Sequence, residues 1–192
     1  IILFFSLLII PFGFSQTDKA WSNYKGQEII ISKSAKRQSF PEDFKLMQLD
    51  LTAMKQALKD TPNRLVSNKS DIVISIPNAE GQLERFRVYE ASNFDTELQA
   101  QFPDIRSYVG LGLDDKFAQL RLSIDPRGIQ TMIFRTDKRN EFMEPYSEDG
   151  KIYAVYSSTR VKGKLPFTCS TQDQSLAIRL SDITSKNNEN TQ

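Results

Sequence analysis

The sequence predicts an α+β domain built mostly from an antiparallel β-sheet, meander-like or sandwich-like, with two short helices. Apolar and polar residues alternate over many short segments, which is typical of strands with one buried and one solvated face. Turn residues such as those at 125–128 separate these segments. Only two segments place apolar residues at helical spacing.

Composition supports a single folded domain without a strong electrostatic partner. The chain has 192 residues, of which 39% are hydrophobic and 26% charged, ordinary values for a globular protein. The net charge is +1, so no broad field attracts nucleic acid or an anionic membrane. Histidine is absent, which removes the usual general base and the commonest zinc ligand.

The first ten residues are almost entirely apolar, and small residues follow them up to Ser15. Such a segment is too short for a transmembrane helix, which needs about 20 residues, but has the length of a signal-peptide core. We expect residues 1–15 to be a Sec-type signal whose start is truncated, and the product to be secreted or held at the cell surface. No stable membrane anchor is expected.

Residues 16–41 are polar and are predicted to be a linker or arm, to which Ile29 to Ile31 adds one edge strand. Residues 42–170 form the predicted β-rich domain. Residues 171–192 become strongly polar and are predicted to be a tail or truncated linker.

Within the domain, residues 44–51 are the first predicted strand. Leu51, Met54 and Leu58 then recur at helical spacing, with Thr52 as the predicted cap, so a short helix with its apolar stripe on a sheet follows. Residues 72–76 and 85–88 predict an antiparallel hairpin. Asp95 is the predicted cap of the second helix.

The remaining domain is predicted to be a series of strands joined by turns. Five further strands are expected, at residues 108–113, 117–124, 129–134, 141–146 and 152–156. The carboxylates near the turns, namely Asp114, Asp115, Asp125, Glu148 and Asp149, are assigned to turn chemistry rather than catalysis.

Two further patterns have simple structural interpretations. Gly110 and Gly112 lack the third glycine and the helix of a phosphate-binding loop. A basic face of four arginines is interpreted as the solvated side of amphipathic strands; these are Arg85, Arg87, Arg121 and Arg127.

Cys169 is the single cysteine, so the domain forms no internal disulfide. A thiolate is a strong zinc ligand, and Cys169 is a candidate fourth ligand for a zinc ion held by another domain, which it would silence in trans. A buried, inert thiol is the alternative.

Three separated phrases occur in order: residues 72–92 (IVISIPNAEGQLERFRVYEAS), residues 102–110 (FPDIRSYVG) and residues 123–132, which begin SIDPRG. This series resembles the pro-region of secreted bacterial reprolysin-like zinc metallopeptidases over roughly residues 40–169. The resemblance implies a following protease domain with a histidine-held zinc. The resemblance also supports Cys169 as an inhibitory zinc ligand, although Ser170 replaces the glycine that often follows such a cysteine.

We therefore expect a non-catalytic pro-region that assists folding of a following protease domain and keeps it latent. This chain itself is expected to be no enzyme, to hold no cofactor and to bind no nucleic acid; its partner is its own protease domain. The alternative is a free-standing secreted β-rich binding or adhesion domain. A hydrolase that uses carboxylates alone is a third hypothesis.

Overall fold

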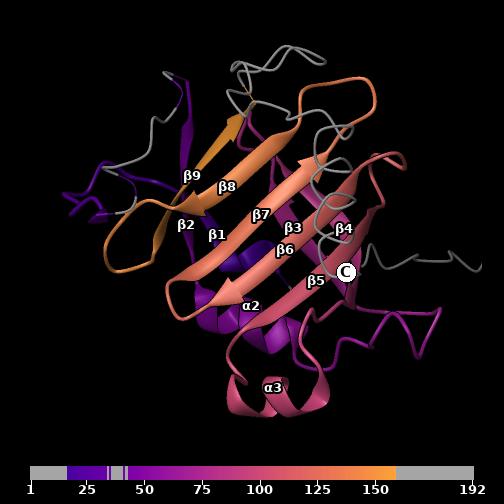
Figure 1. Ribbon diagram of the computed structural model, residues 1–192. Coiled ribbons are helices and arrows are strands. Elements are labelled where there is room, and N and C mark those ends of the chain that lie inside the picture. Colours follow the sequence, from indigo (N-terminus) through magenta and orange to yellow (C-terminus); the bar gives the residue numbers. More distant parts are fainter. Residues whose placement is uncertain (1–16, 34, 36–40, 42, 159–192) are drawn as a thin grey trace, which may run out of the picture. The chain divides into compact units, whose positions relative to one another are not determined.

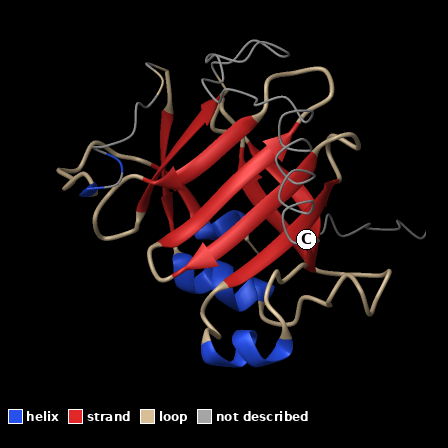
Figure 2. Ribbon diagram, viewed as in Figure 1, coloured by secondary structure: helices blue, strands red, loops and turns tan. Residues whose placement is uncertain are grey.

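Nine strands and three short helical segments are named in the part of the chain that the computed structural model describes, residues 17–33, 35, 41 and 43–158 (Figures 1 and 2). The strands are β1 (Trp21–Asn23), β2 (Lys45–Leu49), β3 (Val73–Pro77), β4 (Leu83–Glu90), β5 (Arg106–Gly112), β6 (Gln119–Asp125), β7 (Gly128–Phe134), β8 (Glu141–Pro145) and β9 (Ile152–Ser157). The helical segments are the 3-10 helix η1 (Asp18–Ala20), α2 (Leu51–Leu58) and α3 (Thr96–Gln101).

All nine strands belong to one sheet in the order β1-β2-β9-β8-β7-β6-β5-β4-β3, and every strand pair in it is antiparallel. The sheet curves into a half-barrel (Figure 2). The predicted α+β class, with a mostly antiparallel sheet and two short α-helices, is confirmed.

The inner face of the sheet carries the hydrophobic core. Alternate residues of β6 and β7 point to this face, so that Leu120 lies opposite Ile133 and Ile124 opposite Ile129, all four fully or almost fully buried. Each such side chain stabilises the fold by about 1.5–3 kcal/mol relative to an exposed position. The outer face of the same strands therefore carries the polar and half-buried residues.

Helix α2 covers part of the core with the apolar stripe that its sequence predicts. Met54 and Leu58 are buried, and Leu51 packs against the core from a half-buried position. The predicted cap is wrong: Asp50, not Thr52, precedes the first turn, and its carboxylate accepts a hydrogen bond from the Ala53 N–H at 3.0 Å. The chain leaves β2 at Leu49, so the residue with extended backbone before the helix is Asp50.

Asp95 caps α3 as predicted and accepts a hydrogen bond from the Leu98 N–H at 2.8 Å. This helix buries none of its residues. Phe102 follows it and lies in ring contact with Phe94, with 6.4 Å between the ring centroids. Helix α3 is therefore a surface element beside the sheet.

The two edge strands of the sheet, β1 and β3, are bridged by side chains from the N-terminal segment, which contact Ser75 in the middle of β3. Trp21 donates its indole N–H to the Ser75 carbonyl at 2.7 Å, and the Ser75 N–H donates to the Thr17 hydroxyl at 2.6 Å. The Ser75 hydroxyl also donates to Asp18. Residues Thr17, Asp18 and Trp21, which we call the N-terminal clasp, thus bridge the two edges.

The clasp belongs to the segment predicted to be a linker or arm. That segment does supply an edge strand, but at Trp21–Asn23. The apolar run at Ile29 to Ile31, which suggested the strand, contributes only an isolated bridge between Ile31 and Ser147. The predicted boundaries at residues 15 and 170 lie outside the described residues.

Candidate interaction groove and buried charge cluster

The outer face of the sheet carries a continuous row of side chains, one from each of six neighbouring strands. The register places Tyr89, Val109, Arg121, Met132, Phe142 and Tyr156 successively opposite one another from β4 to β9. The rings of Phe142 and Tyr156 stack with centroids 5.7 Å apart. In Figure 1, β5 to β8 lie side by side in the foreground with α2 behind them, on the other face.

A groove of about 560 Å³ crosses the middle of this row. Val109, Arg121, Met132 and Phe142 line it from the row itself, and a parallel polar row lines it with Ser107, Ser123 and Gln130. Its floor is therefore apolar on one side and rich in hydroxyl and amide groups on the other.

The charges in the groove are mainly positive. Arg121 from β6 and Arg64 from the loop beside β4 are exposed, and among the described residues neither forms an ion pair. Glu144 is the one carboxylate among the lining residues, and it accepts a hydrogen bond from the Tyr156 hydroxyl. Burial is the largest influence that raises the pKa of Tyr156, followed by its bond to Glu144. The tyrosine therefore stays a donor, and Glu144 is already engaged.

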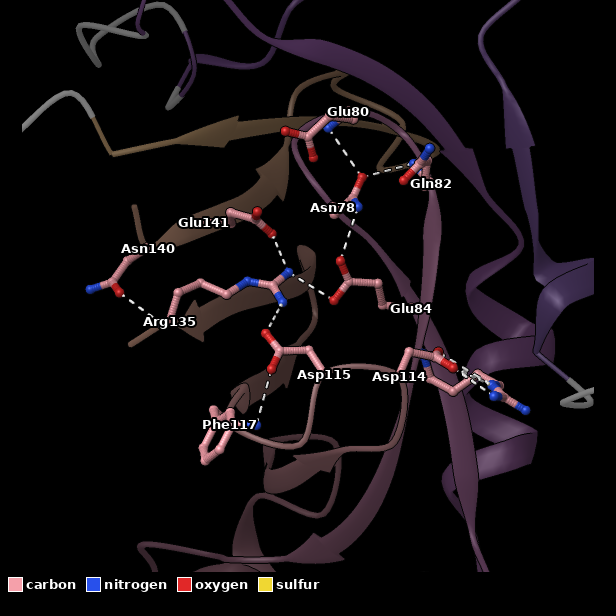
Figure 3. Close-up of polar contacts among 11 residues, drawn as sticks. Asn78, Glu80, Gln82, Glu84, Asp114, Asp115, Phe117, Arg135, Asn140 and Glu141 are labelled. Carbon is pink, nitrogen blue, oxygen red and sulfur yellow. Dashed lines mark hydrogen bonds and ion pairs between the residues drawn. The ribbon is translucent and has the colours of Figure 1, made fainter. Parts of the chain in front are cut away.

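A second polar site lies at the end of the sheet where β4 and β8 begin and β7 ends. The side chain of Arg135 is completely buried there and contacts three carboxylates (Figure 3). Its Nη2 lies 2.8 Å from Glu84 Oε2 and 2.8 Å from Glu141 Oε2, and its Nη1 lies 3.0 Å from Asp115 Oδ2. Asn78 donates to Glu84 at 2.9 Å and extends the network to the β3–β4 turn.

The electrostatics of this cluster hold Arg135 in its charged form. Burial opposes that charge, but the hydrogen bonds and charges of Glu141 and Glu84 outweigh it, so the pKa of Arg135 is raised. Burial is the largest influence on Glu141 and raises its pKa, with Arg135 acting in the opposite direction. One guanidinium therefore neutralises only part of the combined negative charge of the three carboxylates.

The Arg135 cluster connects the β5–β6 turn with the first residues of β4 and β8. The guanidinium occupies the position between the carboxylates, and the described residues contain no group of three or more possible ligands that could hold a metal ion. Asp115 comes from the β5–β6 turn, Glu84 from β4 and Glu141 from β8. The cluster therefore fixes several segments at one end of the half-barrel.

The turn carboxylates mostly behave as the sequence predicts. Asp125, Asp115 and Asp149 each accept a hydrogen bond from the main-chain N–H two residues later, at 2.7, 3.0 and 3.1 Å respectively. Asp114 instead accepts from the main chain and guanidinium of Arg85 on β4. The assignment to turn chemistry omits one role, since Asp115 also joins the Arg135 cluster.

The predicted basic face is divided by ion pairs. Arg85 pairs with Asp114 and Arg127 with Asp125, each at 2.6 Å. Arg87 and Arg121 are exposed on the outer face, as predicted for solvated strand residues. The four arginines therefore do not act as one positive surface.

Gly110 and Gly112 lie within β5 and not in a phosphate-binding loop. A Cβ atom at Gly112 would stand 2.0 Å from the Asp115 carbonyl oxygen, and one at Gly110 would stand 3.0 Å from Leu120. Close packing against Leu120 therefore requires Gly110, and the close approach of the β5–β6 turn requires Gly112.

Cys169 and the apolar segment at residues 1–15 lie outside the described residues. None of the helices in the described part of the chain is long and apolar enough to span a membrane.

Sequence analysis missed Glu84, Arg135 and Glu141 as a connected group. Glu84 has the same alternation phase as buried Phe86, and Glu141 the same phase as buried Met143. A carboxylate in phase with buried residues requires a partner, and this signal was present in the sequence. The cationic partner could not be identified in that way, because Arg135 follows the end of its strand.

Comparison of the chain with models of protein families, with curated proteins and with solved structures finds no match.

Proposed function

We propose that this chain is the non-catalytic pro-region of a secreted zinc metallopeptidase, assisting the folding of a following protease domain and keeping it latent. The single observation that carries the proposal is the ordered series of three phrases that resembles such pro-regions. These phrases fall on β3–β4, on the segment from α3 into β5, and on the β6–β7 turn.

Chemistry of the residues present supports a binding role. The chain lacks histidine, and its single cysteine lies outside the described domain, so the described residues offer neither imidazole nor thiolate to zinc. In this proposal zinc belongs to the protease domain, the chain holds no cofactor, and the precursor is exported through the Sec pathway. The finer description that we propose for this sheet is a meander-like or sandwich-like arrangement of its strands.

The test begins with the coding sequence beyond Gln192, where a protease domain bearing the H-E-x-x-H zinc motif is expected. The full chain is then added in trans to that domain. It should inhibit peptide cleavage stoichiometrically and raise the yield of active enzyme on refolding. A stop codon or an unrelated domain after Gln192, or a chain that changes neither activity nor refolding, defeats the proposal.

Cys169 is proposed as an inhibitory ligand to that zinc, and a matched pair of chains tests this part separately. The wild-type chain should inhibit the protease more strongly than the Cys169→Ser variant, because a hydroxyl is a far weaker zinc ligand than a thiolate. Equal inhibition by both chains would show that the thiol takes no part in inhibition. Latency would then result from the pro-region packing over the cleft of the protease domain.

The alternative, a free-standing secreted binding domain, is favoured by one observation: the groove on the outer face holds two arginines that form no ion pair among the described residues and lie beside apolar side chains. It predicts a natural stop after Gln192 and binding to a surface partner without any protease.

A further inference from the structure

Three surfaces of the sheet are available in principle to a partner: its edges, its inner face and its outer face. The edge at β3 is closed to an added strand, because both main-chain groups of Ser75 are bonded to the clasp and Pro77 has no N–H to donate. The edge at β1 has only three residues. The inner face is filled by the core. The outer face remains.

On that face, Arg121 is placed to bind a negatively charged group of a partner. Its cross-strand neighbours are Val109 and Met132, neither of which can accept a hydrogen bond from a guanidinium side chain in the usual way. By contrast, the strand residues Arg85 and Arg106 and the turn residue Arg127 each have a carboxylate within the domain. Arg121 therefore keeps its hydrogen-bonding capacity for a ligand.

Arg64 is held at the wall of the same groove by main-chain contacts. Its N–H donates to the Glu90 carbonyl at 3.0 Å, and its neighbour Asn63 forms a bridge with Glu90. Tyr89 also donates its hydroxyl to the Asn68 carbonyl at 3.3 Å, which ties the loop to β4. The groove thus presents two positive charges from fixed segments, and its one carboxylate is engaged by Tyr156.

We propose that this groove binds an acidic segment of the following protease domain, with a carboxylate on Arg121 and an adjacent apolar side chain on Met132 and Phe142. The inference rests on the proposed function and identifies the surface through which the pro-region holds its partner. Charge complementarity requires an acidic occupant. The apolar floor favours a polypeptide over a nucleic acid, since Val109 and Met132 lie directly opposite Arg121 and Phe142 lies opposite Met132.

The test measures binding of the full chain to the protease domain by calorimetry, for the wild type and three variants. Arg121→Glu should weaken binding at least tenfold, because it replaces attraction by repulsion, whereas Arg121→Lys should stay within about threefold. Arg87→Glu is the matched control: it makes the same charge change on the same face, at an exposed arginine that does not line the groove. It should bind as the wild type does.

All three variants should fold normally, since the residues replaced are exposed and unpaired among the described residues, and thermal unfolding checks this. A further step reverses acidic residues of the protease domain to lysine. One such reversal should restore binding to Arg121→Glu and so identify the partner carboxylate.

The possible failures are distinguishable. If the wild-type chain binds the protease and Arg121→Glu binds equally well, the groove inference is overturned while the proposed function stands. If the wild-type chain does not bind, the proposed function fails. If Arg121→Glu abolishes self-association or oligonucleotide binding but not protease binding, the groove serves another occupant and the inference is likewise overturned.

Discussion

Arg135 shows how one buried residue can hold several segments of the chain together, since its partners lie in β4, in β8 and in the β5–β6 turn. Its guanidinium is the cation shared by Glu84, Asp115 and Glu141, two of which are largely buried themselves. Removing a single partner from a buried ionic group leaves uncompensated charge, which costs far more than the intact group contributes.

We therefore expect Arg135→Met to lower the free energy of unfolding by about 3–5 kcal/mol at neutral pH. Urea denaturation followed by circular dichroism measures the change. Arg139→Met, at an exposed arginine in the same turn, should stay within about 0.5 kcal/mol. Adding Glu84→Gln and Glu141→Gln to Arg135→Met should recover part of the loss; no recovery would mean that lost packing, not charge, caused it.

Asp114 provides a prediction on pH dependence. Its hydrogen bond with Arg85 is the largest influence on it and lowers the pKa of the carboxyl below its ordinary value of 3.8. The folded protein then binds this proton less readily than the unfolded chain does. The stabilisation is complete above the ordinary value and disappears as the pH falls through the lowered one.

The stability difference between wild type and Asp114→Asn should therefore be largest near neutral pH and vanish in strong acid. Urea denaturation at a series of pH values between about 2 and 7 measures it. A constant difference at all pH values would contradict ionisation as its cause.

At the scale of elements, the two helices have equivalent caps but different packing. Helix α2 buries Met54 and Leu58, whereas α3 buries nothing. Loss of the Asp50 cap should therefore affect global unfolding, and loss of the Asp95 cap should affect only local opening.

We expect Asp50→Ala to lower the free energy of unfolding by about 1 kcal/mol, and Thr52→Ala, at the cap that the sequence suggested, to change it by less than about 0.5 kcal/mol. Asp95→Ala should accelerate hydrogen exchange of the α3 amides with little global effect. Equal destabilisation by the variants at Asp50 and Thr52 would contradict the observed cap.

The alternation of apolar and polar residues predicted most strands, because a strand with one buried face has apolar residues at every second position. Strand β6 is the clearest case, where Leu120, Leu122 and Ile124 are buried and their neighbours are not. Strand β1 is too short to alternate, and its place depends on hydrogen bonds to residues far along the chain. The same holds for the groove, whose members meet only through cross-strand register.

At the scale of the whole described domain, stability depends on how the two edges of the sheet are protected. An open half-barrel exposes two edges, each able to pair with another chain, and the N-terminal clasp occupies the β3 edge with side chains instead of a strand. Trp21 also packs against the buried Tyr153, with ring centroids 6.0 Å apart and the rings nearly perpendicular. The clasp thus protects the β3 edge and also packs against the core.

Ser75 is fully buried, and two substitutions each remove one of its hydrogen bonds to the clasp. These are Trp21→Phe and Thr17→Val. Each should lower the free energy of unfolding by about 1–3 kcal/mol, because a buried carbonyl or N–H is left without its partner. Hydrogen exchange at the Ser75 amide should accelerate in Thr17→Val. Ser22→Ala, at an exposed position of the same strand, should change neither quantity.

The double variant distinguishes a closed edge from two independent bonds. If the clasp acts as one unit, the first substitution already frees the β3 edge, so the second adds less than its separate effect. The freed edge should also promote self-association, which sedimentation measures as a function of protein concentration. Strictly additive losses with an unchanged monomer would show that the two bonds stabilise the domain without guarding its edge.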